Sequence, residues 1–163
     1  MRGKERRKLR VYLDTSVISH LDATDTPDKM LDTTYLWDEI KAGKFEVCVS
    51  GLTMIEIERC PEPKRTTLLE YLSDIKFVEI HQNEEALTLS AMYFDSGGLP
   101  PKSKDDALHI AIASVNDCDV VVSWNFKHIV NLRAIEAVEK TNFAMRYKNI
   151  RILSPSMLLE KED

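Results

Sequence analysis

The sequence has no long apolar run and few cysteines. No segment reaches the roughly 20 consecutive apolar residues that a membrane-spanning helix needs, and no signal-like apolar run with a small-residue cleavage site follows the basic N-terminus. The three cysteines are an odd number without C-x-x-C spacing, which argues against a disulfide framework and a zinc site. We therefore expect a soluble, cytoplasmic protein with reduced thiols, no membrane contact and Cys48 in its core.

Length and charge predict the number of domains and limit how the chain could contact nucleic acid. At 163 residues and 44% hydrophobic content, the chain can bury one sizeable core, and we find no internal repeat. We expect a basic N-terminal arm at residues 1–8 and a single domain at residues 9–160. The net charge is −5 although the first ten residues hold six basic side chains and one acid. A domain this acidic would not attract a polyanion by bulk charge, so a nucleic-acid contact must be local or bridged by metal.

Short β-rich segments alternate with helical patterns along the chain. Strands are expected at residues 9–13, 45–49, 77–80, 119–123 and 150–153. Helices are expected at about 15–21, 28–42, 53–59, 64–73, 83–94, 104–117 and 132–141, with a last one opening at 154–155; residues 96–102 form either a connector or a mobile flap. Strands separated by helices predict an α/β three-layer sandwich, a central parallel sheet flanked by helices.

Two helices are predicted in more detail. In the helix at 28–42, the apolar residues Leu31, Tyr35, Leu36 and Ile40 recur with a period of 3.6 and are expected to face the core. The first helix is expected to be capped by a hydroxyl of the Thr15-Ser16 pair.

Acidic residues stand near the expected ends of the strands. Asp14 follows the first strand, Glu56 and Asp106 lie in what we expect to be the first turns of helices, and Asn125 follows the fourth strand. The carboxyl ends of parallel strands meet at one edge of a sheet, where ligands gather. Because a desolvated carboxylate is costly unless something positive lies beside it, the acids indicate a cation at that edge.

The donor types suggest which cation and which reaction. A site of carboxylates without histidine or cysteine ligands suits Mg²⁺ or Mn²⁺ rather than zinc. Such a site can hydrolyse a phosphodiester by activating water and stabilising the leaving oxygen. Asn125 would orient water or phosphate without adding charge. Thr15, Ser16 and Ser123 offer hydroxyls at the same edge for substrate, phosphate or water contacts.

Each acid also has a purely structural interpretation. Glu56 is the third residue after Thr53, and Asp106 is the third after Ser103, which is the spacing of a capping box. Asp14 could itself be a helix N-cap. Only the joint placement of the three acids at one edge favours metal binding.

Four neighbouring residues leave alternatives open. Asp105 competes with Asp106, because both precede the same apolar helix. His109 and His128 could approach phosphate, although histidines in such positions are more often packing residues. Trp124 is interpreted as a packing residue rather than a platform for a base.

Taken in order, these motifs resemble the PIN-domain family, and most closely its VapC-type toxins. They are Val11-Tyr-Leu-Asp14-Thr-Ser16, Ser50-x-x-Thr53-x-x-Glu56, Asp106-Ala-Leu-His-Ile-Ala and Ser123-Trp-Asn125-Phe. The resemblance covers nearly the whole chain. It implies a PIN-like fold, an endoribonuclease dependent on Mg²⁺ or Mn²⁺, frequent homodimerisation and a small antitoxin as partner.

The resemblance also suggests roles for single residues. Asp14, Glu56 and Asp106 match the three metal-ligating acids of the family, and the registry of the third motif favours Asp106 over Asp105. The fourth family position is often Asp, whereas this chain has Asn125. Because Asn brings no negative charge, a second metal would be bound more weakly.

Two other functions compete with the nuclease. A catalytically degenerate PIN module could bind RNA or protein without cutting, which the neutral Asn125 and the acidic domain would suit. A phosphohydrolase of the haloacid-dehalogenase type also has an Asp after its first strand. That mechanism wants a second acid two residues later, where this chain has Ser16, so we rank it last.

Overall fold

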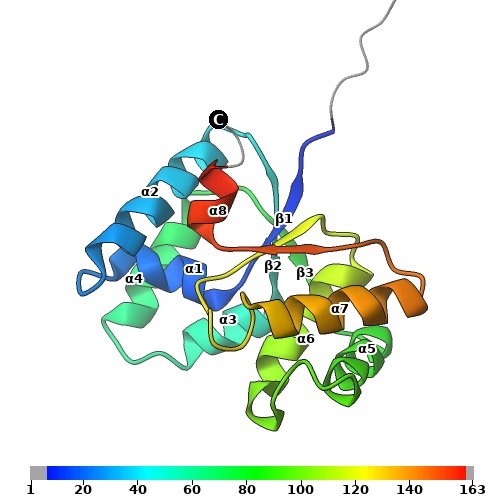
Figure 1. The fold of residues 1–163 in the computed structure, drawn as a ribbon. Coiled ribbons are helices and arrows are strands. Elements are labelled where there is room, and N and C mark those ends of the chain that lie inside the picture. The colour runs from blue at the N-terminus through cyan, green and yellow to red at the C-terminus, as the bar shows by residue number, and fades with distance from the viewer. Residues whose placement is uncertain (1–6, 161–163) are drawn as a thin grey trace, which may run out of the picture.

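The computed structural model describes residues 7–160, which form a five-stranded sheet with helices on both faces (Figure 1). The strands are β1 (Arg10–Leu13), β2 (Glu46–Ser50), β3 (Val78–Ile80), β4 (Val120–Val122) and β5 (Arg151–Leu153). The helices are α1 (Thr15–Ser19), α2 (Pro27–Lys41), α3 (Gly51–Glu58), α4 (Lys64–Ser73), α5 (Glu84–Asp95), α6 (Lys104–Val115), α7 (Leu132–Ala144) and α8 (Pro155–Glu160), with 3₁₀ turns η1 (His20–Asp22) and η2 (Pro101–Ser103). The strand order is β3-β2-β1-β4-β5, and every neighbouring pair is parallel. The predicted three-layer α/β sandwich is confirmed.

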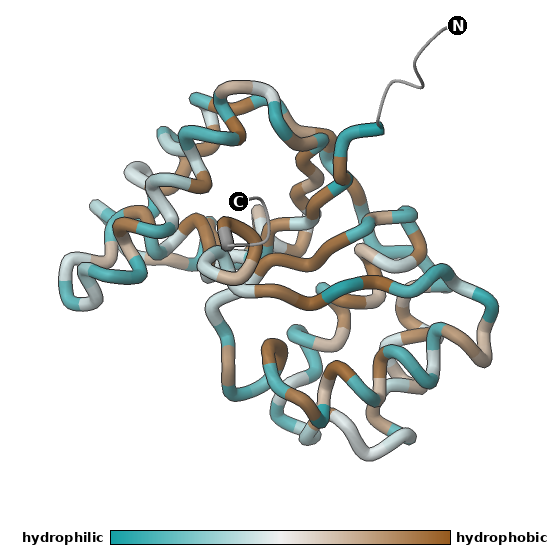
Figure 2. Tube along the Cα trace, turned by 45° about the horizontal axis from the view of Figure 1, so that its top comes forward, coloured by the Kyte–Doolittle hydropathy of each residue, from teal (hydrophilic) through white to brown (hydrophobic). Residues whose placement is uncertain are grey.

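The middle strands are buried on both faces. β4 is Val-Val-Val with every residue buried, and β1 is buried from Val11 to Leu13, as near-continuous apolar runs of parallel strands should be. Successive side chains of a strand point to opposite faces. Accordingly, Val11 and Leu13 pack into one core while Tyr12 packs into the other. Figure 2 shows the hydrophobic strands crossing the centre of the molecule.

The two cores belong to different sets of helices. The core on the Tyr12 side takes its buried side chains from α5, α6 and α7, and the opposite core takes them from α1, α2, α3, α4 and α8. Within α6, every residue from Ala107 to Ser114 is buried. This helix lies between the sheet and α5, so the third candidate acid, Asp106, stands at the start of a deeply embedded helix.

Helix α2 corrects one detail of the sequence prediction. Its buried residues are Thr33, Leu36, Trp37 and Ile40, whereas Leu31 is half exposed, and so is Tyr35. The stripe is therefore rotated toward Thr33 and Trp37, because Thr33 can bury its hydroxyl by bonding to the Lys29 carbonyl oxygen.

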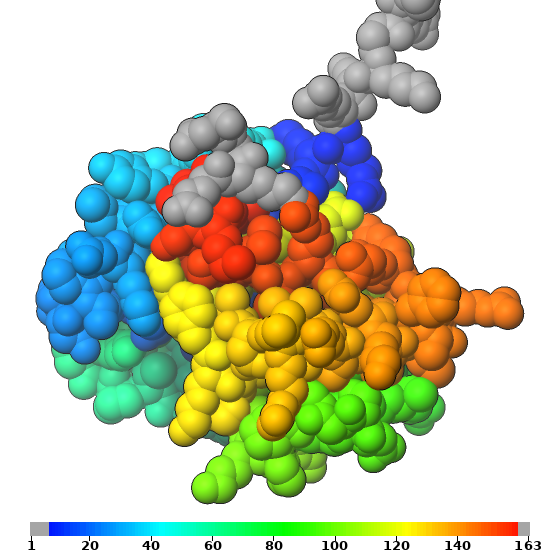
Figure 3. All heavy atoms as spheres, in the orientation of Figure 1, coloured from blue at the N-terminus to red at the C-terminus, as the bar shows by residue number. Residues whose placement is uncertain are grey.

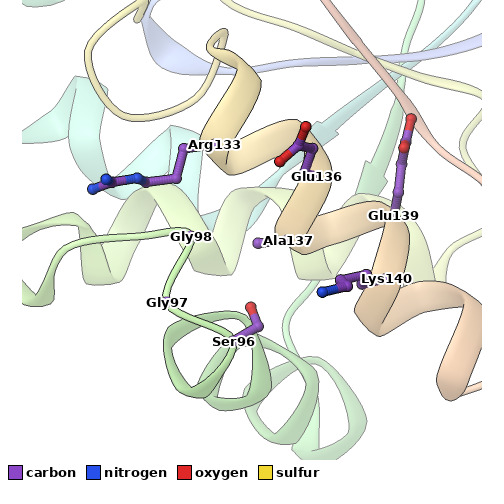
Figure 4. Close-up of a pocket in the computed structure, with 8 residues that line it drawn as sticks. All are labelled: Ser96, Gly97, Gly98, Arg133, Glu136, Ala137, Glu139 and Lys140. Atoms are coloured by element: carbon purple, nitrogen blue, oxygen red, sulfur yellow. The ribbon is translucent and has the colours of Figure 1, made fainter.

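The segment before α6 is an anchored connector rather than a flap. Leu99 is buried, and the chain at Gly98 runs directly against Ala137 of α7 (Figure 4). A Cβ at Gly98 would lie 1.9 Å from the Ala137 Cβ atom, a distance that no side chain could accept. Gly97 beside it has a φ of +78°, which favours glycine. This pair of glycines lets the connector lie close to α7.

Three further sequence predictions can be compared with the structure. No helix within residues 7–160 is long and apolar enough to cross a membrane. Cys48 is buried in the core as predicted, and it is a free thiol. Most of the basic arm, residues 1–6, lies outside the described residues, but Arg7 forms an ion pair with Asp119.

Candidate metal and nuclease site

Asp14 is the single residue between β1 and α1. Its Oδ1 atom accepts hydrogen bonds from the Ser16 hydroxyl (2.6 Å) and from the Val17 amide (3.3 Å), and its Oδ2 atom accepts one from the Ser123 hydroxyl (2.5 Å). Asp14 is therefore the N-cap of α1, and the prediction of a Thr15 or Ser16 cap was wrong. The side chain is 4% exposed. Burial raises its pKa above the ordinary aspartate value, although His109 and the two hydroxyls act in the opposite direction.

The serines beside Asp14 hold it in place. The Ser16 hydroxyl accepts from the Trp124 amide (2.9 Å), and the Ser123 hydroxyl accepts from the Asn125 amide (2.9 Å). A hydroxyl has only one proton to donate, and each serine gives it to Asp14. Both hydroxyl protons are thus engaged by the acid, and the contacts of Ser16 and Ser123 with substrate stay a prediction. Together they tie the turn after β4 to the end of β1.

Glu56 lies in the second turn of α3, not the first. The N-cap of α3 is Ser50, whose hydroxyl accepts from the Thr53 amide (3.1 Å), so the capping box suggested by Thr53 and Glu56 does not form. Instead, Glu56 Oε1 accepts from the Thr15 hydroxyl (2.9 Å), which gives Thr15 a role in holding the acid. The helix start is satisfied without Glu56, and its carboxylate is free to face the site.

His109 is the second partner of Glu56. Its Nε2 atom lies 2.5 Å from Glu56 Oε1, and because an ionised carboxylate only accepts, Nε2 donates. Burial opposes ionisation of both groups, but the contact prevails: the pKa of Glu56 is lowered and that of His109 is raised. His109 is 2% exposed, so this contact lies in the interior, next to the acids.

A buried hydrogen-bond chain continues from His109 into the sheet. The Tyr12 hydroxyl lies 2.5 Å from His109 Nδ1 and 2.7 Å from the Ser50 hydroxyl. Burial raises the pKa of Tyr12, so the phenol keeps its proton and can donate. Sequence reasoning missed Tyr12. The available signal was a hydroxylated aromatic within an apolar strand, two residues before Asp14.

Asp106 is the third residue of α6, and it has the fewest contacts of the three acids. It makes no hydrogen bond or ion pair with any residue in the range 7–160 that the structure describes. Burial raises its pKa, and the negative charges of Asp14 and Glu56 raise it further, while His109 and His128 act in the opposite direction. The three acids therefore sense one another electrostatically, although they come from three separate elements.

Asp105 and Asp106 differ in exposure, and the suggested role at a helix cap is not seen for Asp106. Asp105 is exposed, whereas Asp106 is half-buried. The Ser103 hydroxyl donates to the Pro100 carbonyl oxygen (2.7 Å) and does not cap α6. The second suggested capping box is thus absent as well, and Asp106 does not cap α6.

Asn125 shapes the turn after β4. Its Oδ1 atom accepts from the backbone amide of His128 (2.9 Å), and its backbone N–H donates to the Ser123 hydroxyl. The Nδ1 atom of His128 is buried without a hydrogen-bond partner among the described residues. Because buried polar atoms are nearly always paired, a group that the protein itself does not supply would fit beside His128.

The donor set fits a hard divalent cation. All three acids offer oxygen, none is paired with lysine or arginine in the described part of the chain, and burial or mutual repulsion raises the pKa of two of them. Within residues 7–160, however, no three His, Cys, Asp or Glu side chains stand close enough to form a finished metal site. A cation would thus have to draw these carboxylates together.

Comparison with known proteins identifies the fold of this chain. No protein-family model and no curated protein matches the sequence. Among solved structures, the chain is similar to VapBC2 from Rickettsia felis bound to a DNA fragment from its promoter, with a TM-score of 0.53 and 13% identity over 90% of this chain and 98% of the other. The chain has a VapC-like PIN fold.

A second VapC structure agrees. VapC20 from Mycobacterium tuberculosis, described as a sarcin-ricin loop cleaving toxin, matches with a TM-score of 0.50 and 14% identity over 72% of this chain and 91% of the other. The family resemblance of the four motifs is thereby confirmed at the level of the fold. At such low identity the VapC-like fold alone is shared, and the activity has to be argued from the residues of this chain.

Proposed function

We propose that this protein is a metal-dependent endoribonuclease whose site is formed by Asp14, Glu56, Asp106 and Asn125. The observation that carries the proposal is the gathering at the carboxyl edge of the sheet of three acids, none of which forms an ion pair with a lysine or arginine within residues 7–160. Desolvated acids that repel one another are unfavourable unless the site serves to bind a cation.

Asp14, Asp106 and Glu56 would hold Mg²⁺ or Mn²⁺, because hard cations prefer carboxylate oxygens. When bound, the cation supplies Lewis-acid activation of the phosphodiester and stabilises the leaving oxygen. The chain's own part is orientation: the Ser16 and Ser123 hydroxyls fix Asp14, and His109 fixes Glu56 and keeps it ionised.

The outer residues have lesser roles in this proposal. Asn125 keeps the turn beside the site and adds no charge, which favours one tightly held metal rather than two. His128 is close enough to influence Asp106 and can contact phosphate. Asp105 is exposed and is not needed by the mechanism.

We propose the biological setting from the likeness of the fold. VapC20 is described as a toxin that cleaves a loop, and VapBC2 is bound to a fragment of its promoter. By analogy, we propose that this protein acts in the cytoplasm as the toxin of a toxin–antitoxin pair, forms a homodimer and is neutralised by a small antitoxin. Analogy of fold is a weaker warrant than the acids themselves.

The decisive experiment is cleavage of structured and unstructured RNAs with Mn²⁺, Mg²⁺ or chelator, using the wild type, Asp14→Asn and the exposed control Asp105→Asn. We expect cutting that requires metal, is lost in Asp14→Asn and persists in Asp105→Asn. Equal cutting by the wild type and Asp14→Asn, or cutting in chelator, would contradict the proposal.

A second candidate is a PIN module that binds without cutting. It is favoured by the neutral Asn125 and by the lack of a preassembled three-ligand site within residues 7–160. If the wild type binds Mn²⁺ and RNA but cleaves no RNA in the panel, this candidate replaces the nuclease. A dehalogenase-type phosphohydrolase gains no support, because Ser16 stands where the second acid should be and only orients Asp14.

A further inference from the structure

Two aromatic residues follow β4, in the turn that Ser123 ties to Asp14. The rings of Trp124 and Phe126 meet edge to face, with centroids 6.1 Å apart and planes at 67°. Trp124 is 6% exposed, and its Nε1 atom donates to the Thr33 hydroxyl (2.8 Å), which fixes the ring. Phe126 is 45% exposed. The pair therefore consists of a rigid buried ring and an exposed ring that rests on it.

A cation lies beside both rings. The Lys29 Nζ atom is 5.3 Å from the centroid of Phe126 and 5.6 Å from that of Trp124. These distances are within the range of a cation–π contact. Figure 3 shows the segment around residues 124–130, in yellow, against the N-terminal helices, in blue. The exposed ring is thus accompanied by a positive charge on an otherwise acidic chain.

The aromatic pair is tied to the proposed catalytic edge. Ser123 bonds to Asp14, and the Trp124 amide bonds to Ser16. Phe126 is three residues beyond Ser123, so its backbone lies within about 10 Å of that of Ser123. An RNA strand whose phosphate sat at the acids would carry a neighbouring base past Phe126.

We propose that Phe126, supported by Trp124 and accompanied by Lys29, is a stacking site for one unpaired base of the RNA strand that crosses the acids. The proposal rests on the proposed function for its substrate. Stacking of bases on aromatic side chains is the usual means of holding single strands, and it tolerates any base. A neutral base also suits a chain of net charge −5, which cannot attract RNA by bulk charge.

Binding can be measured without cleavage. We would titrate fluorescein-labelled oligouridine in chelator into protein carrying Asp14→Asn and follow the fluorescence anisotropy. Adding Phe126→Ala should weaken binding about tenfold, Phe126→Leu should do the same, and Phe126→Trp should retain the parent affinity. Lys29→Gln should weaken binding about twofold to threefold. The matched control is Phe143→Ala, which removes a phenylalanine that is 87% exposed on α7 and should change nothing.

Abasic probes separate stacking from other causes. Among oligouridines with one base removed at successive positions, one probe should bind the parent about tenfold more weakly. The same probe should bind Phe126→Ala no more weakly than intact oligouridine does. Independent, additive losses would overturn the proposal, since the base and the ring would then not be in contact. Thermal melts confirm that each variant is folded.

The outcomes distinguish this site from the nuclease proposal. If the wild type cuts RNA but Phe126→Ala binds as the parent does, the stacking site is refuted and the nuclease stands; Phe126 would then face a protein partner instead. If the wild type cuts nothing but binding depends on Phe126, the stacking site stands without the nuclease. Absence of oligouridine binding by the parent also overturns the stacking site.

Discussion

Acids at the two edges of the sheet differ in their partners and in the direction of their pKa shifts. At the amino edge, Asp119 lies just before β4 and pairs with Arg7 (2.8 Å) and Lys148 (2.9 Å), and it also accepts from the Arg10 amide. These partners outweigh the effect of burial and lower its pKa. At the carboxyl edge, Asp14 and Asp106 have no lysine or arginine partner among the described residues, and burial raises the pKa of both.

In our proposal, the difference separates an edge whose acids stabilise the fold from an edge whose acids bind a ligand. Acids paired with cations complete their electrostatics within the protein. Acids desolvated beside other acids are unfavourable in the free protein, and binding of a cation would remove that cost. The same residue type on one sheet thus serves the fold at one edge and, in our proposal, catalysis at the other.

Breaking the carboxyl edge should have the largest effect. Asp106→Asn removes an acid that makes no hydrogen bond or ion pair with any residue in the range 7–160, so we expect RNA cleavage to fall at least about a hundredfold, since metal activation contributes several kcal/mol. Asp105→Asn, one residue away and exposed, should stay within about threefold of the wild type. Initial cleavage rates under single-turnover conditions measure both. Equal losses in the two variants would mean that helix charge, rather than Asp106 itself, matters.

His109 is the buried partner of Glu56 at the carboxyl edge, and its removal should cost stability. His109→Ala leaves Tyr12 and Glu56 without a shared partner, so we expect a loss of about 2–4 kcal/mol. Tyr12→Phe keeps the shape and should cost about 1–2 kcal/mol. The exposed His81 offers the control His81→Ala, which should change little. Urea unfolding in chelator measures all three, and an unaltered midpoint for His109→Ala would refute the role of the buried chain.

The two edges should respond to pH with opposite signs. The pKa of Asp106 is raised in the folded protein, so its contribution to stability is full below pH about 4 and is lost as pH rises through the folded pKa. The pKa of Asp119 is lowered, so its contribution is present above pH about 4 and is lost as pH falls through the folded pKa.

Two substitutions test this opposition in metal-free protein. Asp106→Asn should raise the melting temperature at neutral pH, and Asp119→Asn should lower it by the equivalent of about 1 kcal/mol. The Asp106 difference should vanish near pH about 3, and the Asp119 difference should vanish as pH falls below the folded pKa of Asp119. Thermal melts across this range measure them, and shifts of the same sign in both variants would invalidate the comparison.

The smallest expected effect is on metal affinity at the carboxyl edge. Asn125→Asp adds a charge while its Oδ1 atom can still accept from His128, so Mn²⁺ should bind severalfold more tightly. Asn83→Asp is the control, because Asn83 caps α5 through the Ala86 amide in the same manner but lies outside the site. The rise in melting temperature with Mn²⁺ concentration reports affinity. Equal rises in the two variants would indicate unspecific attraction.

The sequence predicted the sheet and the three acids for one physical reason. Buried parallel strands are recognisable as apolar runs, and their carboxyl ends must share an edge. Asp14, Glu56 and Asp106 could therefore be assigned to that edge before their surroundings were known.

The contacts that fix those acids could not be predicted. Ser123 and Asp14 are 109 residues apart, and Tyr12 and His109 are 97 apart. Such pairs depend on strand register and on the rotation of α6, neither of which local patterns determine. The same limitation explains the error in α2, where Thr33 is buried because it accepts from Trp124.

The position of Asp14 as the cap of α1 bears on how related sequences should be compared. A chain that had lost nuclease activity would still be selected to keep Asp14, because folding of α1 depends on it. Persistence of this aspartate would then be a poor sign of catalysis. Asp106 has no such duty, so in a lineage drifting away from enzymatic function it should be the first of the acids to vary.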